Sequence, residues 1–508
     1  MKPNIVIIMA DQLAPHFCGA YGHKIAKTPN IDSLAKRGMR FDAAYCNSPL
    51  CAPSRFSFMS GQLVSRIAAY DNASEFKAST PTFAHYLKTL GYRTCLSGKM
   101  HFVGPDQKHG FQDRITTDIY PSDFAWTPDW EAPDERIDKW YHNMQTIKES
   151  GVAVATFQTD YDDEVGFAAR RWLIDRGRNK ANGNKEPFAM VASFIHPHDP
   201  YVAKPEWWNL YSDDEIDLPE CKIAPEKMDP FSRRLMNGIE ASYVPLTDEE
   251  VIRARRAYLA NVSYFDSKVG EIVKTLEDIR EIENTLIIIT ADHGDMLGER
   301  GLWYKMNFFE HSARVPLIFS GPGVVKGANR NACSLVDILP TLLEVAGGGK
   351  GMLGEPIDGR SLLPLASGER DEKNEAIGEY CAEMTPYPVF MIRRDNFKYI
   401  HCDPDPPQLY NLDEDLLEKN NLAFDSKYSS LVENFSKEVS KRWNSEKLRL
   451  DIINTQKSRR ALHSAMEAGA GEHWDYNPPS DASQEYVRNH MDWTIAAERY
   501  RFPPYKSK

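Results

Sequence analysis

The sequence predicts an α/β fold in which helices sandwich a large, mostly parallel sheet. A smaller antiparallel sheet with a helix and an extended carboxyl-terminal tail should follow it. Three observations support this prediction. Apolar runs alternate with helical segments from residue 4 to residue 345, short strands separated by turns begin near residue 375, and the final segment is polar but rich in aromatic residues. We therefore divide the chain into an α/β domain, an α+β subdomain and a tail, over residues 1–374, 375–450 and 451–508.

The first half of the chain supplies the opening strands and helices. Residues 4–10 form a nearly unbroken run of β-branched and other apolar residues, which is typical of a strand buried on both faces of a parallel sheet. The first helix should end before Gly38, because glycine is a common helix stop. The expected elements are strands at 4–10, 92–96 and 188–194, and helices at 29–37 and about 80–91.

The second half continues the alternation and then changes character. Thr247 and Glu250 form a capping box that opens a long charged helix, expected to end near residue 280. Two further strands and one helix complete the large domain. Short strands and one more helix are typical of the smaller subdomain. The expected bounds are 285–290, 316–319 and 335–345 in the first group, and 389–393, 398–401, 408–410 and 427–444 in the second.

Polar residues follow three of the predicted strands. Asp11 comes directly after the first strand, His196 and His198 follow another, and Asp292 and His293 follow a third. In doubly wound sheets, ligands bind beyond the carboxyl ends of the strands. Although these residues lie far apart in the sequence, we expect them to converge at one edge of the sheet.

The converging carboxylates predict a metal site. A hard divalent cation prefers carboxylate oxygens from separate strand ends, and Asp11 and Asp292 fit that preference, with the His293 imidazole beside them. Gln12 is either a neutral ligand or a group that orients Asp11. Asp295 is expected to be a turn residue or to lie outside the shell of metal ligands.

Cationic side chains elsewhere in the sequence are candidates for transfer of a sulfate or phosphate group. Such chemistry needs cations around a tetrahedral anion, placed to meet the charge that grows in the transition state. Arg55, Lys99, His101 and Lys305 are the candidates. His198 is a candidate for protonating a leaving oxygen, since histidine titrates in the useful range.

Composition limits the partners and the compartment. The 508 residues carry a formal net charge of −12, which argues against nucleic acid as a partner and is compatible with a small cationic substrate. Eight cysteines show no paired spacing, and no apolar run is long enough to span a membrane. The short apolar run at the amino terminus is too short for a signal peptide. We expect a reduced, cytoplasmic enzyme without a membrane partner.

A family resemblance becomes specific at Cys51. Residues Cys51 to Arg55 match the C-x-P-x-R pattern, in which sulfatases oxidise the cysteine to Cα-formylglycine. The chain resembles the formylglycine sulfatases of the alkaline phosphatase superfamily, and most closely their bacterial choline sulfatase branch. The likeness runs nearly end to end and includes residues 48–55 (SPLCAPSR), 98–107 (GKMHFVGPDQ), 116–121 (TTDIYP), 126–129 (WTPD), 196–201 (HPHDPY), 292–303 (DHGDMLGERGLW), 305–310 (KMNFFE) and 489–491 (NHM).

The resemblance implies an alkaline phosphatase-like fold and a role for each candidate residue. The metal ligands would be Asp11, Asp292, His293 and the oxidised Cys51, with Gln12 where many arylsulfatases have a second aspartate. Calcium is the family's usual ion, but the imidazole suits Mn²⁺ or Zn²⁺ better. A formylglycine-generating or other sulfatase-maturating enzyme would be a required partner.

The family mechanism assigns the remaining groups. A hydrated formylglycine attacks sulfur, and its second hydroxyl later lets sulfate leave. The resemblance implies that Arg55 holds the diol and that His198 and His101 carry protons. Lys99, Lys305 and Asn72 would bind the sulfate oxygens.

The resemblance also implies a pocket for a quaternary ammonium group. Aromatic faces and carboxylates hold such a cation. The matching positions are Trp126, His142, Glu383 and Asp492, with Trp493 adjacent. In the family the carboxyl-terminal tail helps to form oligomers, so we expect a dimer or tetramer.

The expected reaction is hydrolysis of choline-O-sulfate to choline and inorganic sulfate. One alternative is a phosphonate monoester or phosphodiester hydrolase, or a broader alkyl or aryl sulfatase, on the same scaffold. A more remote alternative is a metal-binding relative in which Cys51 stays unoxidised and no catalysis occurs.

Overall fold

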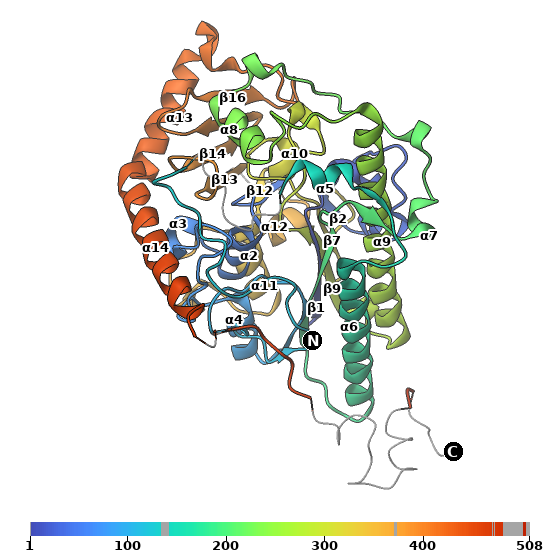
Figure 1. Cartoon of the computed structure of the whole chain (residues 1–508). Coiled ribbons are helices and arrows are strands. Elements are labelled where there is room, and N and C mark those ends of the chain that lie inside the picture. The colour runs from blue at the N-terminus through green and yellow to red at the C-terminus, as the bar shows by residue number, and fades with distance from the viewer. Residues whose placement is uncertain are drawn as a thin grey trace, which may run out of the picture.

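A large sheet with helices on both faces forms the body of the molecule (Figure 1). A smaller four-stranded sheet lies beside it, nearer the carboxyl terminus. The predicted α/β architecture is therefore confirmed. The computed structural model describes residues 2–133, 142–369, 373–469, 471, 473–480 and 501–503.

The large sheet has eight strands in the order β11-β2-β10-β9-β1-β7-β4-β5. Strand β10 is antiparallel to both of its neighbours, and the other neighbouring strands run parallel. Because the central strands β7, β1 and β9 are parallel, their carboxyl ends meet at one edge of the sheet. The bounds are β1 Asn4–Asp11, β2 Met39–Phe41, β4 Arg93–Gly98, β5 Asp113–Arg114, β7 Phe188–Pro197, β9 Thr285–Ala291, β10 Leu317–Ser320 and β11 Gly327–Asn329.

Helices cover both faces of this sheet. In Figure 1, α6 and α9 lie on one side of the central strands, and α2, α4 and α11 lie on the other. The predicted capping box opens α9, where Thr247 Oγ1 accepts a hydrogen bond from the backbone N–H of Glu250 at 3.2 Å. The helices up to residue 366 are α1 Pro29–Arg37, α2 Cys51–Ser60, α3 Val64–Ile67, α4 Phe83–Thr89, α5 Met144–Lys148, α6 Phe157–Ala181, α7 Pro205–Trp208, α8 Pro230–Gly238, α9 Asp248–Asp278, α10 Glu310–Ala313, α11 Ile338–Val345 and α12 Leu363–Ala366.

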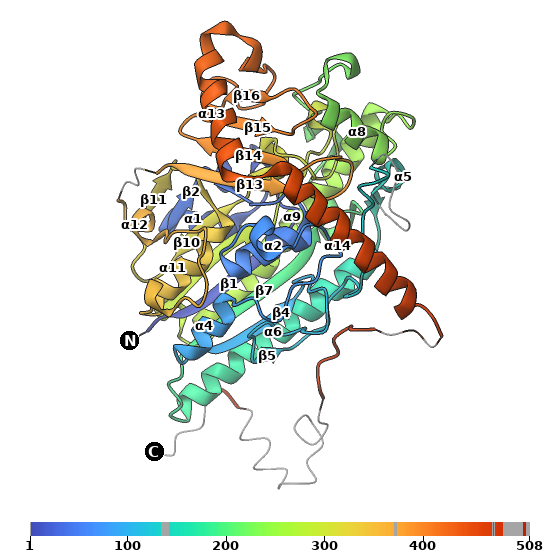
Figure 2. The same cartoon turned by 90° about the vertical axis from the view of Figure 1, so that its left-hand side faces the viewer.

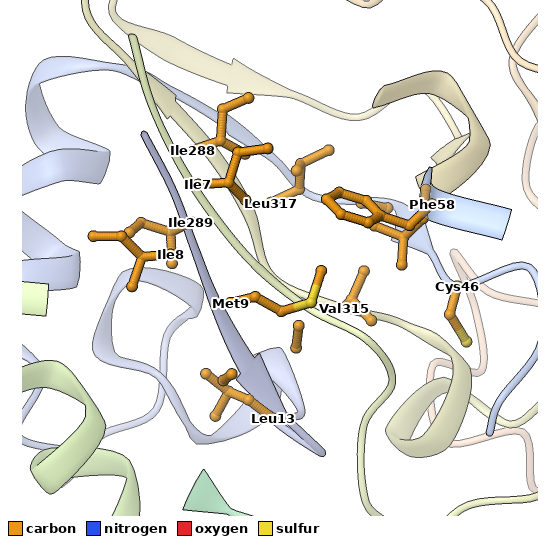
Figure 3. Close-up of a cluster of buried hydrophobic side chains, with 14 of the residues drawn as sticks. Ile7, Ile8, Met9, Leu13, Cys46, Phe58, Ile288, Ile289, Val315 and Leu317 are labelled. Atoms are coloured by element: carbon orange, nitrogen blue, oxygen red, sulfur yellow. The ribbon is translucent and has the colours of Figure 1, made fainter. Parts of the chain in front are cut away.

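The core fixes the position of the central strands. Ile7, Ile8 and Met9 of β1 lie near Ile288 and Ile289 of β9 (Figure 3), and each of these side chains is at most 1% exposed. Burying one such side chain contributes about 1.5–3 kcal/mol. A one-residue slip would turn these side chains to the opposite face, so the packing also fixes where the polar residues after each strand emerge.

The second sheet is antiparallel, in the order β13-β14-β15-β16, as the turn-rich sequence predicts. Helix α13 packs against it, with the ring of Phe435 stacked on Tyr399 at a centroid distance of 5.3 Å. Helix α14 then leads away from this sheet (Figure 2) and passes through residue 451, the predicted start of the tail. The bounds are β13 Glu375–Tyr380, β14 Val389–Arg394, β15 Phe397–His401, β16 Gln408–Asn411, α13 Ser429–Arg442 and α14 Ser445–Met466. Two small sheets of two short strands each are formed by β3 Ala44–Tyr45 with β12 Cys333–Ser334 and by β6 Gly151–Val152 with β8 Val202–Ala203.

Part of the carboxyl-terminal segment folds back on its own chain. The Trp474 ring meets the edge of Phe124 at a centroid distance of 5.2 Å. The hydroxyl of Ser122 donates to Asp475 Oδ1 at 3.0 Å, and the hydroxyl of Tyr476 donates to a backbone carbonyl at 3.1 Å. The aromatic residues of this stretch therefore pack within the chain.

Several helices go beyond the sequence prediction, and two of them matter most for the site. Helix α2 begins at Cys51, and α6 spans 25 residues between β6 and β7. The buried face of α6 includes the polar Gln158 and Asp162, which interrupts the apolar periodicity that would reveal a helix. None of the described helices is long and apolar enough to cross a membrane.

Candidate active site

Side chains from the ends of three parallel strands meet at one edge of the sheet. Asp11 is the last residue of β1, His198 follows the end of β7, and Asp292 follows the end of β9. Asp11 Oδ1 lies 3.9 Å from His198 Nε2, and all three side chains are buried. The convergence predicted from the strand ends is present in the structure.

Four buried side chains form a cluster that fits a divalent cation. Asp11, Cys51, Asp292 and His293 each offer one donor atom, and these atoms lie within 4.8 Å of one another. Cys51 Sγ is 3.2 Å from His293 Nε2 and 3.8 Å from Asp11 Oδ1. If Cys51 is oxidised, Sγ marks the place of a formylglycine oxygen. Two carboxylates, an imidazole and that oxygen form a donor set suited to Ca²⁺ or Mn²⁺.

Arg55 orients the two carboxylates of this cluster. Its Nη2 donates to Asp11 Oδ2 at 2.9 Å, and its Nε donates to Asp292 Oδ2 at 2.8 Å. The Oδ1 atom of each carboxylate therefore remains on the side of Cys51 and His293. Burial acts to raise the pKa of Asp11, but the charges of Lys99, His198 and Arg55 outweigh it and hold that pKa well below its usual value.

Cys51 is the first residue of α2 and is completely buried. Burial, followed by the nearby Asp11 carboxylate, raises the pKa of the encoded thiol to about 12. The thiol is then protonated at neutral pH and is a weak nucleophile. Asn72 Oδ1 accepts a hydrogen bond from the Ala52 N–H at 3.0 Å, which places Asn72 at the start of the same helix.

Two buried lysines lie beside the cluster. Lys99 Nζ forms an ion pair with Asp11 and lies 4.2 Å from the centroid of the Tyr120 ring. Lys305 Nζ donates to Gln12 Oε1 at 2.6 Å and lies 2.8 Å from His198 Nε2. Although burial acts to lower the pKa of Lys305, neighbouring acidic groups raise it, so Lys305 is cationic. The two ammonium groups can receive the oxygens of an anionic ligand.

The two predicted proton carriers have different surroundings. His198 Nδ1 lies 2.6 Å from the backbone oxygen of Asp199, which favours a proton on Nδ1 and leaves Nε2 to exchange a proton with a ligand. His101 has both ring nitrogens buried without a hydrogen-bond partner among the described residues. Such a group is unusual unless a ligand or water satisfies it. Burial, with nearby cations, lowers the pKa of both imidazoles well below the usual value.

Gln12 faces away from the metal-binding cluster. Its Nε2 donates to Asp199 Oδ1 at 3.1 Å and to Asp295 Oδ2 at 2.6 Å, while its Oε1 accepts from Lys305. Its backbone N–H donates to Asp292 Oδ1 at 3.0 Å. The side chain of Gln12 therefore contacts Lys305, Asp199 and Asp295. Asp295 also lies outside the cluster, as expected.

Two aromatic residues of the predicted head-group pocket lie beside the proton carriers. The Trp126 ring meets the edge of His101 at a centroid distance of 5.8 Å. The His142 ring is 6.1 Å from that of His198 and 4.6 Å from that of Tyr304. Segments that are distant in the sequence therefore enclose one side of the site.

Glu383 supplies a buried carboxylate near the same side. It is 3% exposed, and Tyr380 donates a hydrogen bond to its Oε2 at 3.1 Å. Burial is the main cause that raises the pKa of Glu383 to about 7, and the charges of Asp71 and Lys305 also act on it. The remaining two predicted pocket residues, Asp492 and Trp493, lie outside the described residues.

Sequence reasoning did not single out Tyr120 and Asp118. The Tyr120 ring lies 5.1 Å from His101, 5.2 Å from Trp126 and 6.0 Å from His198, measured between centroids. Asp118 Oδ2 accepts the backbone N–H of His101 at 2.9 Å. Both residues fall within the family-like run at 116–121, which was the available signal.

Comparisons with known proteins agree with this geometry. The family model described as Sulfatase matches residues 3–348. The one described as N-sulphoglucosamine sulphohydrolase, C-terminal, matches residues 298–445, and the one described as Choline sulfatase enzyme C terminal matches residues 450–502. The third match begins within α14.

Individual relatives extend the likeness over the whole chain. A choline-sulfatase of Rhizobium meliloti (strain 1021) is 46% identical over 507 residues, covering 99% of both chains. Arylsulfatase K of Danio rerio is 27% identical and covers 98% of this chain and 93% of its own. The crystal structure of a phosphonate monoester hydrolase of Agrobacterium radiobacter matches with a TM-score of 0.69 at 21% identity, covering 91% of this chain and 96% of its own, which shows a shared fold. The chain therefore belongs to the sulfatase family and is a sulfuric ester hydrolase.

Proposed function

We propose that this enzyme hydrolyses choline-O-sulfate to choline and inorganic sulfate. The observation that carries the substrate assignment is the similarity to choline-sulfatase along 99% of both chains. The site is compatible with it, because a buried carboxylate and aromatic rings lie beside two buried lysines.

The chain's own residues divide the work around the sulfate. The sulfate oxygens are bound by Lys99, Lys305 and Asn72. Arg55 keeps the Asp11 and Asp292 carboxylates in place. The hydrated aldehyde of residue 51, together with a divalent cation, would supply the hydroxyl that attacks sulfur. The second hydroxyl of residue 51 would then allow sulfate to leave. Holding cationic groups where negative charge grows lowers the barrier to transfer.

Two histidines move the protons. In its doubly protonated form, His198 gives the Nε2 proton to the choline oxygen as the bond of that oxygen to sulfur breaks, and it returns to the neutral form with its proton on Nδ1. This transfer matters because an alkoxide is a poor leaving group. His101 takes the proton of the second hydroxyl of residue 51, so that sulfate departs and the aldehyde is restored. The nitrogens of His101, which have no hydrogen-bond partner in the described part of the chain, are suited to this role.

The head-group pocket holds the fixed positive charge of choline. Trp126 and His142 offer ring faces, and Glu383 offers a carboxylate. We assign Asp492 and Trp493 to the same pocket from the family resemblance. This side of the site determines the substrate, because the metal cluster is common to hydrolases of other esters.

The remaining assignments follow from the same argument. The metal is Ca²⁺, with Mn²⁺ as the alternative that the His293 imidazole favours. Residue 51 requires a formylglycine-generating or other sulfatase-maturating enzyme. The segment from residue 451 to residue 508 forms a tail that takes part in a dimer or tetramer. Eight unpaired, buried cysteines suit the reducing cytoplasm.

A phosphonate monoester or phosphodiester hydrolase is the second candidate, favoured by the shared fold with the Agrobacterium radiobacter enzyme. A panel of four esters separates the two: choline sulfate, neohexyl sulfate, p-nitrophenyl sulfate and a phenylphosphonate monoester. Neohexyl sulfate is the neutral carbon isostere of choline sulfate. We expect the highest kcat/KM for choline sulfate. A higher value for the phosphonate or for p-nitrophenyl sulfate would overturn the substrate assignment. A protein that keeps Cys51 unoxidised when it is produced with a sulfatase-maturating enzyme, and that turns over none of the esters, would favour the non-catalytic alternative.

A further inference from the structure

One face of α14 contacts two segments that carry residues of the proposed pocket and connects to a third through Trp130. These segments contain Asn72, Trp126 and Glu383, which lie far apart in the sequence. Arg459 of α14 reaches the residue before Asn72, and Gln456 reaches the loop that follows Trp126. Figure 2 shows the helix as a long red rod that extends from the small sheet.

The contact of Arg459 is a buried, two-pronged ion pair. Its Nη1 donates to Asp71 Oδ1 at 2.6 Å, and its Nη2 donates to Asp71 Oδ2 at 2.7 Å. Asp71 is fully buried and Arg459 is 6% exposed. Nη1 also contacts Thr127 Oγ1 at 3.4 Å, directly after Trp126. A guanidinium fork fixes orientation as well as distance, which a single lysine charge does not.

Gln456 extends the same contact surface by one helical turn. Its Oε1 accepts the backbone N–H of Trp130 at 2.9 Å. The indole N–H of Trp130 donates to the backbone oxygen of Ala382 at 2.7 Å, next to Glu383. Residues 456 and 459 thus connect the helix to both the aromatic and the acidic side of the pocket.

We propose that Arg459 is a positioning residue that sets the preference of the enzyme for a cationic leaving group. It touches no substrate and acts through Asp71, Thr127 and the loop that carries Trp126. This inference rests on the proposed function, since it concerns the same head-group pocket. It assigns a role in substrate choice to α14, whose sequence lies at the start of the carboxyl-terminal family match.

Charge adds to the geometric argument. Asp71 acts to raise the pKa of Glu383, and Arg459 offsets the Asp71 charge at close range. Burial has the largest effect on the pKa of that carboxylate, and a backbone hydrogen bond, the Tyr380 hydroxyl and Lys305 act to lower it. Without the guanidinium, the Asp71 charge would oppose ionisation of Glu383, and the pocket would lose part of its attraction for a cation.

The test compares head-group preference, defined as kcat/KM for choline sulfate divided by kcat/KM for neohexyl sulfate. Arg459→Met should lower this ratio about tenfold, while kcat/KM for neohexyl sulfate should change less than about threefold. Arg459→Lys, which keeps the charge and loses the fork, should give an intermediate loss. Lys457→Ala is the matched control, because it removes an exposed ion pair between the same helix and Glu131. Its ratio should equal that of the wild type.

The outcomes separate this inference from the proposed function. If the wild type shows no preference for choline sulfate, the proposed function itself fails, and the inference fails with it. The wild type can show the preference while Arg459→Met either retains it or loses kcat/KM equally for both esters. In both cases Arg459 has only a structural role, and only the inference fails. If Arg459→Met does not fold, the double variant Asp71→Asn with Arg459→Met removes both buried charges. It should fold and still show a lowered ratio, because the fork is lost, but the loss should be smaller than in Arg459→Met because no Asp71 charge opposes ionisation of Glu383. An unchanged ratio in the double variant would overturn the inference.

Discussion

Glu383→Gln provides a direct test of charge recognition in the pocket. The substitution keeps the size and a hydrogen-bond acceptor for Tyr380 but removes the negative charge. The side chain is 3% exposed, so water screens its charge only weakly. A carboxylate in such a place attracts a quaternary ammonium group but has no such attraction for its neutral carbon isostere.

The magnitude follows from burial and from the pKa of Glu383. An attraction of about 2 kcal/mol corresponds to roughly thirtyfold in kcat/KM, so choline sulfate should lose about that factor near pH 8. Burial raises the pKa of Glu383 to about 7, so the group is mainly protonated below that pH. The preference for choline sulfate should therefore rise with pH through about 7, and below that value it should fall toward the ratio of the variant, by roughly thirtyfold in all.

The assay measures head-group preference from about pH 5.5 to about pH 8.5 for the wild type and the variant. Burial raises the pKa values of Asp199 and Asp295 to about 7 and about 6. Because these two groups affect kcat/KM for both esters, their effect cancels in the ratio. The variant should give a low ratio that is independent of pH. Equal losses for both esters, or a variant that keeps the wild-type pH profile, would refute the reasoning.

Three further perturbations test other parts of the molecule. Cys51→Ser, produced in a host that does not oxidise serine, should lose multiple turnover by orders of magnitude, and retained turnover would remove the aldehyde from the mechanism. His198→Gln should lower kcat for choline sulfate about a hundredfold. It should lower kcat for p-nitrophenyl sulfate much less, because nitrophenolate leaves without a proton. Equal losses of kcat for the two esters would argue against a role of His198 as proton donor. Lys398→Met should lower the free energy of unfolding by about 3–5 kcal/mol in urea titrations, because it leaves Glu310 and Glu418 as buried carboxylates. Lys398 Nζ lies 2.6 Å and 2.8 Å from those two groups, so an unchanged midpoint would show that their charges are not retained in the folded protein.

The sequence predicts the strand ends well because burial leaves a clear pattern. The apolar runs before Asp11 and Asp292 belong to strands buried along their whole length, so their ends are easy to locate. Parallel pairing then brings the following polar residues together without any detailed side-chain prediction. The metal-binding cluster could therefore be predicted although two of its residues, Asp11 and Asp292, are 281 positions apart in the sequence.

Other features depend on contacts that have no local signal. The orientation of Gln12 toward Lys305 depends on side chains that the fold brings together across 293 residues. The start of α2 at Cys51 follows no capping side chain, since Leu50 occupies the N-cap position. The bond of Arg459 to Asp71 spans 388 residues, and an arginine on a helix ordinarily indicates a solvated surface. Such tertiary contacts override local patterns.

The most direct measurement relates turnover to the chemical state of residue 51. Preparations that differ in maturation are analysed by mass spectrometry of the Cys51 peptide, and each is assayed with choline sulfate at saturation. We expect kcat to rise in proportion to the fraction of formylglycine and to extrapolate to zero when only cysteine is present. Substantial hydrolysis of choline sulfate by fully unoxidised protein would contradict this expectation.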